Sequence, residues 1–79
     1  HTDLDVLAVR EFAARGAPGE IDLPGGLDWA QLTELVGSAL EADGCRGWSL
    51  VIYNPDRDPD GRAAQRIVRL VEDVAPSFP

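Results

Sequence analysis

Residues 48–53 read Trp-Ser-Leu-Val-Ile-Tyr, a nearly continuous apolar run that lies between Gly47 and the pair Asn54-Pro55. Such a run is typical of a β-strand that is covered on both faces, as in a parallel sheet. Parallel strands need a long crossover connection, which is usually a helix. The stretch therefore predicts an α/β fold with helices before and after this strand.

The segment before this strand carries the signals of a helix over residues 28–43. Asp28 suits the N-cap, Gln31 stands where a capping box needs it, and Gly44 suits the left-handed position after the last turn. Its apolar residues recur at helical spacing on one face, with Leu35 at the edge of that face. The residues expected to be buried are Trp29, Leu32, Val36, Ala39 and Leu40.

A second helix is predicted over residues 59–75. Asp58 would be its N-cap, Pro59 its first residue, and Pro76 would end it. The residues expected to be buried are Ala63, Ala64, Ile67, Val68, Val71 and Val74.

The N-terminal third is less regular. Leu4 and Val6 alternate with Asp3 and Asp5, and this period of two indicates a short strand or the end of one. Residues 8–14 suit a single helical turn, and residues 16–27 must form a loop, since residues 16–26 contain four Gly and two Pro. Residues 1–79 thus read as a single partial domain in the order strand, loop, helix, strand, helix, a βαβα fragment of a larger parallel sheet.

The net charge of −7 comes from fourteen acidic residues against seven basic ones, all of them Arg. Nucleic acids and anionic membranes demand clustered positive charge, so neither is an expected partner. The single Cys45 cannot form an internal disulfide, and no stretch has the length and apolarity of a membrane span. The cytoplasm is therefore the expected location.

Three segments together resemble the arginase (ureohydrolase) family, which includes agmatinases and formiminoglutamases. Asp3-Leu4-Asp5 is similar to the Asp-x-Asp at the end of a family strand, and Leu23-Pro24-Gly25-Gly26-Leu27 is similar to the family's Pro-Gly-Gly-Leu stretch before a helix. Asn54-Pro55 is similar to the Asn-Pro that ends the last core strand. Order and spacing agree over residues 1 to about 75.

The resemblance implies the C-terminal segment of a three-layer α/β/α domain with a binuclear Mn²⁺ site. In the family, a hydroxide that bridges the two metals attacks a guanidino or amidine carbon and cleaves a C–N bond. Asp3 would bridge the metals and Asp5 would hold one of them, while the remaining ligands would come from the rest of the parent polypeptide. The resemblance implies no catalytic residue in this chain, no activity of the fragment alone, and a homo-oligomeric parent.

Two positions depart from the family pattern. Ile52 stands where the family usually has a Glu that holds the substrate guanidinium, so the substrate stays open. His1 stands where the family usually has Ser, either as an outer-shell donor or as a tolerated change. The alternative is a different class of protein, a small acidic interaction module that self-associates through an exposed strand edge.

Overall fold

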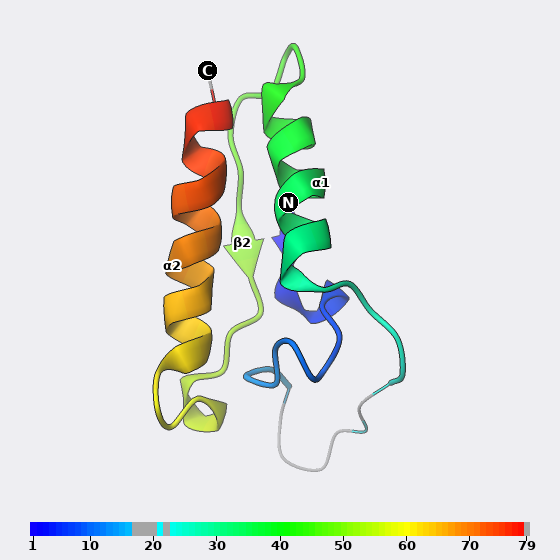
Figure 1. Cartoon of the computed structure of the whole chain (residues 1–79), viewed down its shortest axis with the longest axis vertical. Coiled ribbons are helices and arrows are strands. Elements are labelled where there is room, and N and C mark those ends of the chain that lie inside the picture. Colours follow the sequence, from blue (N-terminus) through cyan, green and yellow to red (C-terminus); the bar gives the residue numbers. More distant parts are fainter. Residues whose placement is uncertain (17–20, 22, 79) are drawn as a thin grey trace.

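The fold was analysed on a computed structural model that describes residues 1–16, 21 and 23–78. The order of its β-strands and α-helices confirms the predicted succession of strand, helix, strand and helix (Figure 1). These elements are β1 (Thr2–Asp3), α1 (Trp29–Glu41), β2 (Leu50–Val51) and α2 (Arg62–Val74), and 3-10 helices occupy Leu4–Val6, Pro55–Arg57 and Ala75–Ser77.

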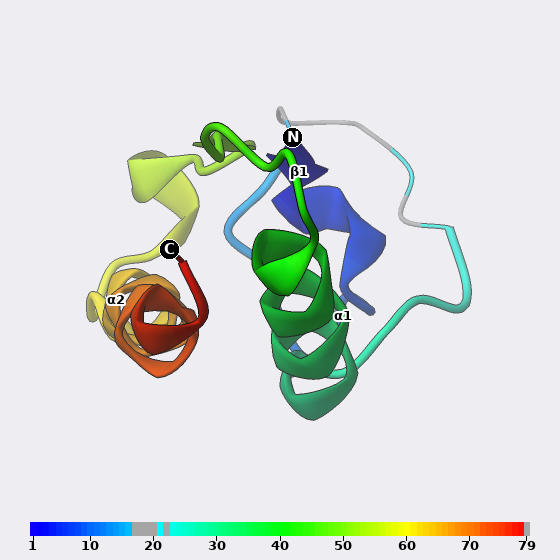
Figure 2. The same ribbon diagram turned by 90° about the horizontal axis from the view of Figure 1, so that it is seen from above.

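The two strands form a parallel pair in which Thr2 lies beside Leu50 and Asp3 beside Val51. Both helices lie on the same side of this pair, so the described chain has two layers (Figure 2). The radius of gyration is 13.1 Å, against about 12 Å for a compact chain of this length. The result is a small mixed helix–strand domain whose second sheet face carries no helix within the described residues.

The predicted strand over residues 48–53 is much shorter in the structure, where only Leu50–Val51 joins the ladder. Leu50 packs against the core, whereas Val51, Ile52 and Tyr53 are each more than one third exposed. The physical reason is the partner: β1 ends at Asp3, so β2 has no further residues to pair with among those described. The prediction that this strand is covered on both faces is therefore wrong for the described residues.

Helix α1 begins as predicted. The Asp28 carboxylate accepts the Gln31 backbone N–H at 2.7 Å, and the Gln31 side chain accepts the Asp28 N–H at 3.0 Å, which completes the capping box. The helix ends at Glu41, two residues before the predicted end, and Gly44 has the expected left-handed conformation with φ of 87°. Of the five residues expected inside, only Ala39 is exposed.

Helix α2 begins at Arg62, three residues later than predicted, and ends at Val74. Gly61 takes the N-cap position with φ of 72°, and its left-handed backbone prevents the helix from starting at Pro59. Asp58 still provides hydrogen-bond acceptors for backbone N–H groups of the first turn, because its carboxylate accepts the N–H groups of Ala63 and Ala64, each at 3.0 Å.

The buried stripe of α2 also differs from the prediction. Leu70 and Val74 are buried, whereas Val68 and Val71 are 55% and 42% exposed. At about 100° per residue, Val68 lies about 160° around the helix from Leu70 and so faces away from α1 and β2. The apolar periodicity of α2 fits two stripes, and only contact with the rest of the chain selects between them.

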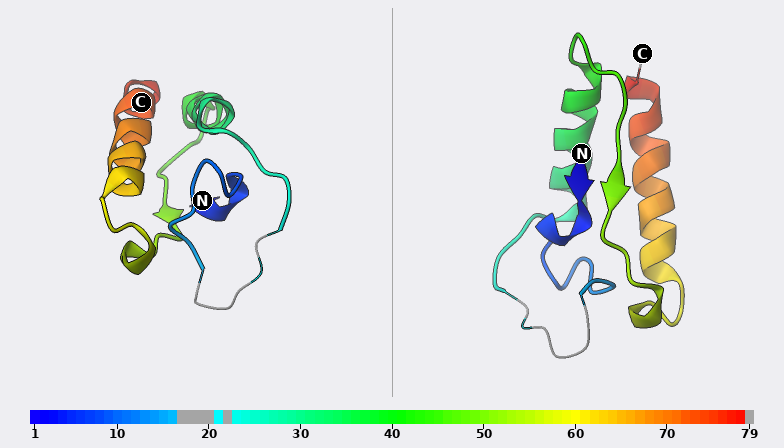
Figure 3. Two further views of the ribbon diagram at one scale, coloured as in Figure 1. Left: turned by 60° about the horizontal axis from the view of Figure 1, so that its bottom comes forward. Right: turned by 180° about the vertical axis from the view of Figure 1, so that it is seen from behind.

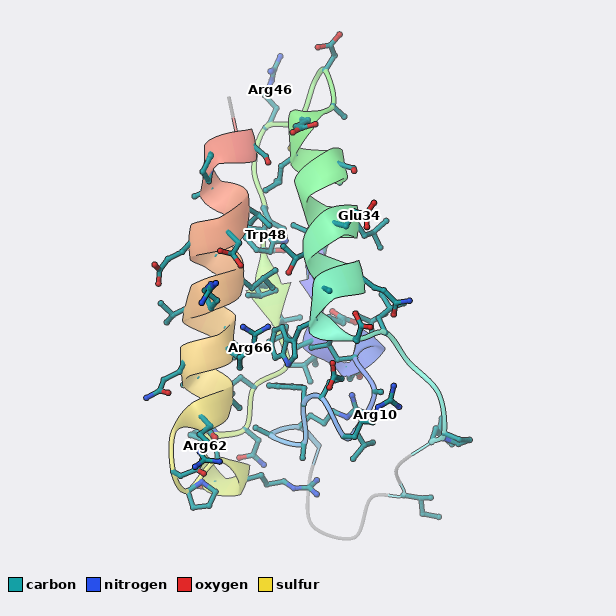
Figure 4. All side chains as sticks on the ribbon, in the orientation of Figure 1. Arg10, Glu34, Arg46, Trp48, Arg62 and Arg66 are labelled. Atoms are coloured by element: carbon teal, nitrogen blue, oxygen red, sulfur yellow. The ribbon has the colours of Figure 1, made fainter. Side chains whose placement is uncertain are left out.

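Trp29, the first residue of α1, connects the parts of the core. Its ring meets Phe12 edge-on with centroids 6.0 Å apart, its indole N–H donates to the Glu11 carbonyl at 2.9 Å, and the Arg66 guanidinium lies 4.9 Å from its centroid. Figure 4 shows Arg66 extending from α2 toward the first turn of α1. The buried cluster around it comprises Leu4, Leu7, Phe12, Ala14, Trp29, Leu32, Val36, Leu40, Leu70 and Val74.

Figure 3 shows the N-terminal segment beside the start of α1, and Leu27, which precedes α1, pairs with this segment. The Leu27 N–H donates to the Val6 carbonyl at 2.9 Å, and its carbonyl accepts the Ala8 N–H at 2.8 Å. Within residues 8–14 the predicted helical turn is present, because the N–H groups of Glu11 and Phe12 both donate to the Ala8 carbonyl. The predicted loop 16–27 has no helix in its described residues, and residues 17–20 and 22 of that loop lie outside them.

Among the described residues, neither helix combines the length and the apolar composition that crossing a membrane requires.

The close approach of Gly26 to the chain after β1 gives a test of this architecture. A Cβ on Gly26 would lie 2.5 Å from the Ala8 nitrogen, whereas a Cβ on Gly25 would meet nothing within 4 Å, although both residues have positive φ. We expect Gly25→Ala to lower the free energy of unfolding by about 1–2 kcal/mol through the left-handed backbone alone. Gly26→Ala should cost at least about 1 kcal/mol more in urea denaturation. Equal losses would show that this backbone contact is absent.

Candidate functional site

A groove with a volume of about 670 Å³ lies between α1 and the segment that carries β1. Its floor is apolar, and its rim carries His1, Thr2, Asp3 and Asp5. The apolar lining comes mostly from α1 and from the segment that leads into β2, with Leu32, Leu35, Val36, Ala39, Leu40 and Trp48. The groove therefore places two carboxylates beside an apolar surface.

The structure brings Asp3 and Asp5 to the same groove but not along one strand. Asp3 is the last residue of β1, and Asp5 lies in the 3-10 helix Leu4–Val6. The strand that the alternation indicates therefore ends at Asp3, and a 3-10 helix carries Asp5. The Arg15 guanidinium, which donates to the carbonyls of Asp5 and Leu7, holds this turn and is a residue that sequence reasoning missed.

Asp3 is engaged by a polar cluster that spans the two strands. His1 Nε2 lies 2.8 Å from Asp3 Oδ1, and His1 Nδ1 lies 2.7 Å from Ser49 Oγ. The pairing of β1 with β2 brings these groups together, since the Thr2 N–H donates to the Ser49 carbonyl at 2.9 Å. Among the described residues, no hydrogen bond engages Asp3 Oδ2 or the Asp5 carboxylate.

The donor chemistry of the groove suits a hard divalent cation, because carboxylate oxygens are the ligands that Mn²⁺ and Mg²⁺ prefer. The number of donors is too small for a complete site. Among the described residues, no group of three or more His, Cys, Asp or Glu side chains is arranged to hold a metal ion. Asp3 and Asp5 therefore fit a share of a metal site, and the other ligands would have to come from elsewhere.

The other two segments of the resemblance are tied to the chain that follows β1. Leu27 pairs with Val6 and Ala8 directly after the Asp-x-Asp segment. The Asn54 N–H donates to the Ala14 carbonyl at 2.8 Å, and its side-chain amide donates to the Gly16 carbonyl at 2.8 Å. Both segments are thus joined by hydrogen bonds to backbone atoms of residues 6–16, the stretch that follows the Asp-x-Asp segment in the chain.

Ile52 is the only described residue other than glycine with positive φ, at 74°. This conformation is rare and costly for a β-branched side chain, and such strain concentrates at functional positions. Ile52 is also the position at which the family resemblance expects Glu. The strain could not be read from the sequence, since Ile favours extended backbone.

Tyr53 and Asp58 form a second polar pair, and the sequence predicted only the helix-capping part of it. The Tyr53 hydroxyl donates to Asp58 Oδ2 at 2.8 Å. Desolvation acts to raise the pKa of Asp58, but the hydrogen bonds from Ala63, Tyr53 and Ala64 outweigh it and lower the pKa below its ordinary value. The same hydrogen bond to Asp58, with desolvation and the carboxylate charge, raises the pKa of Tyr53.

Comparisons with known protein families, characterised proteins and solved structures find no match for this chain.

The strain at Ile52 predicts that Asn, which tolerates the left-handed region, stabilises this position relative to an unstrained neighbour. Val51 is the matched control, because it is 37% exposed against 39% for Ile52 and lies in β2. Both substitutions lose apolar burial, but only Ile52→Asn relieves backbone strain. We expect Ile52→Asn to be more stable than Val51→Asn by about 1–2 kcal/mol in urea denaturation. A more stable Val51→Asn variant would contradict the left-handed assignment.

The lowered pKa of Asp58 predicts a pH-dependent contribution to stability. Because its pKa is lower in the folded state, the contribution is fully present above the ordinary value of 3.8 and is lost as the pH falls through the folded value. Asp58→Asn should therefore lower the urea midpoint at pH 7, and its difference from the parent chain should shrink below about pH 4. Asp56→Asn is the control, since the structure describes no hydrogen bond to the Asp56 carboxylate. Parallel pH profiles for both variants would disprove this role of Asp58.

Proposed function

We propose that this chain is the C-terminal segment of an arginase-like ureohydrolase, a binuclear Mn²⁺ hydrolase of guanidino or amidine C–N bonds. In this proposal Asp3 and Asp5 contribute to the metal site, and the chain by itself is inactive. The rest of the parent polypeptide supplies the other ligands and the missing parts of a three-layer α/β/α domain.

One observation carries the proposal: the Pro-Gly-Gly-Leu and Asn-Pro segments are both hydrogen-bonded to residues 6–16, the stretch that follows the Asp-x-Asp segment. The Asp-x-Asp segment runs directly into Val6 and Ala8, which pair with Leu27 of the Pro-Gly-Gly-Leu segment. The Asn-Pro segment is bonded to Ala14 and Gly16. Chance motifs at sequence separations of 20 to 50 residues have no reason to meet in this way, whereas segments that build one site do.

The exposed apolar surface supports a larger parent fold. Val51, Ile52 and Tyr53 leave apolar area on and beside β2, and Val68 and Val71 leave apolar area on α2. A parallel sheet is normally buried on both faces, and two strands alone are marginally stable. A second helical layer and further strands would bury this area, as the three-layer proposal requires.

The chemistry of the groove supports a metal-assisted reaction more than side-chain catalysis. Two close metal ions need carboxylates to offset their mutual repulsion and to position the attacking oxygen. Asp3 and Asp5 are the carboxylates on the groove rim. Ile52 cannot accept a hydrogen bond from a guanidinium, so the proposal extends to the reaction class and not to one substrate.

A second candidate, from a different class, is a small acidic interaction module that self-associates through the edge of β1. The observation that favours it is the position of β1, which has only β2 as a neighbour within the described sheet. Successive peptide groups alternate along a strand, so the N–H and C=O of Asp3 point away from β2. Such an edge can template a further strand.

The proposal predicts that the 79-residue chain binds Mn²⁺ weakly, at the groove rim. Substoichiometric Mn²⁺ should broaden the NMR signals of Asp3, Asp5 and their neighbours first, with millimolar or weaker affinity, because two ligands of about six are present. The double variant Asp3→Asn/Asp5→Asn should abolish this selective broadening.

Asp43→Asn is the control, because Asp43 is an exposed carboxylate in the turn after α1 and lies outside the groove. It should leave the broadening unchanged. Uniform broadening, or selective broadening that survives the double variant, would exclude the proposed role of Asp3 and Asp5. A stable dimer in the same metal-free sample, seen by light scattering, together with no selective broadening would favour the interaction module.

A further inference from the structure

The polar cluster of His1, Asp3 and Ser49 crosses from β1 to β2 on the rim of the groove. An ionised carboxylate can only accept hydrogen bonds, so the contact of 2.8 Å between Asp3 Oδ1 and His1 Nε2 places the imidazole proton on Nε2. In the neutral ring Nδ1 is then an acceptor, and the Ser49 hydroxyl donates to it at 2.7 Å. With the ring neutral or protonated, Nε2 donates to Asp3, and the imidazole links Asp3 to Ser49.

These two hydrogen bonds constrain the Asp3 side chain through His1 and Ser49, which lie outside β1. The imidazole is held at both nitrogens, and one of its anchors, Ser49, is fixed because its carbonyl accepts the Thr2 N–H in the parallel ladder. A carboxylate at the exposed end of a strand otherwise samples several rotamers. The bond to Oδ1 selects one of them and leaves Oδ2 outside the described hydrogen bonds.

The order serine, histidine, aspartate also occurs in serine hydrolases, but there it works in a water-excluded site with an oxyanion hole. The side chains of His1 and Asp3 are both more than half exposed. The solvated setting does not suit acyl transfer, whereas it does suit a hydrogen bond that orients a metal-binding carboxylate. Such outer-shell bonds fix ligand geometry and commonly change metal affinity by about 10–100-fold.

We infer that His1, anchored by Ser49, is a positioning residue that holds Asp3 with one carboxylate oxygen directed to a divalent cation at the groove rim. This inference rests on the proposed metal role of Asp3 and assigns a task to the position where the family pattern has a different residue. It also explains why the pairing of β1 with β2 matters for the site: Ser49 precedes β2, so the ladder carries the anchor of the imidazole.

Two substitutions of His1 distinguish the role of Nε2, which contacts Asp3, from that of Nδ1, which contacts Ser49. The amide nitrogen of glutamine matches the position of Nε2, and that of asparagine matches Nδ1. His1→Gln can therefore keep the donor to Asp3, whereas His1→Asn loses it. The metal-free readout is the χ1 rotamer distribution of Asp3, obtained from three-bond NMR couplings. We expect one dominant rotamer in the parent chain and in His1→Gln, and averaging over several in His1→Asn.

The metal readout is the relaxation that Mn²⁺ adds at the Asp5 amide. It should fall about tenfold in His1→Asn and stay within about threefold in His1→Gln. An Asp3 rotamer that is equally averaged or equally ordered in all three chains would overturn the inference, as would Mn²⁺ relaxation that is unchanged in His1→Asn. If the rotamers differ as expected but the parent chain gives no Mn²⁺ effect at Asp3 and Asp5, the proposed metal function fails and the orientation of Asp3 by His1 stands alone.

Discussion

The burial of the Trp29 indole is the interaction on which the rest of this structure depends. The indole begins α1, packs edge-on against Phe12, donates to the Glu11 carbonyl and lies under the Arg66 guanidinium. One side chain thereby joins the turn after β1, the first helix and the second helix. Aromatic and cation–π contacts of this kind contribute about 1 kcal/mol each beyond burial. The described residues form a sheet of only two short strands, so contacts of Trp29 hold together parts of the fold that a wider sheet would otherwise connect.

The parallel pair β1–β2 has little stability of its own, but it sets the geometry of the site. Its register places Thr2 beside Leu50, brings Ser49 to His1, and so positions the last residue of β1, Asp3, at the groove. The 3-10 helix that follows turns Asp5 to the same groove. Carboxylate oxygens are the ligand type that hard cations prefer, and Val51, Ile52 and Tyr53 leave apolar surface exposed on and beside β2.

Local sequence signals predicted those features whose cause is also local. The start of α1 follows from Asp28 and Gln31, which satisfy each other's backbone N–H groups within one turn. Gly44 takes a left-handed conformation that glycine adopts without cost. The order strand, helix, strand, helix follows from hydrophobic patterning in the same way, because each element must bury its own apolar residues. Asp3 and Asp5 were singled out by the resemblance of their segment to the family's Asp-x-Asp motif, and both line the groove.

Tertiary contacts alone decided the remaining features. Val68 and Val71 are exposed because α2 packs into the core through Leu70 and Val74, and no periodicity can tell which of two apolar stripes meets a partner. The strained backbone of Ile52 and the turn that carries Asp5 depend on where β1 stops, which is a property of strand pairing. The amino-acid sequence by itself determined the elements and the residue types of the candidate site. The tertiary structure decided their boundaries, their exposed faces and the contacts of Asp3, because those arise between residues that are distant in the chain.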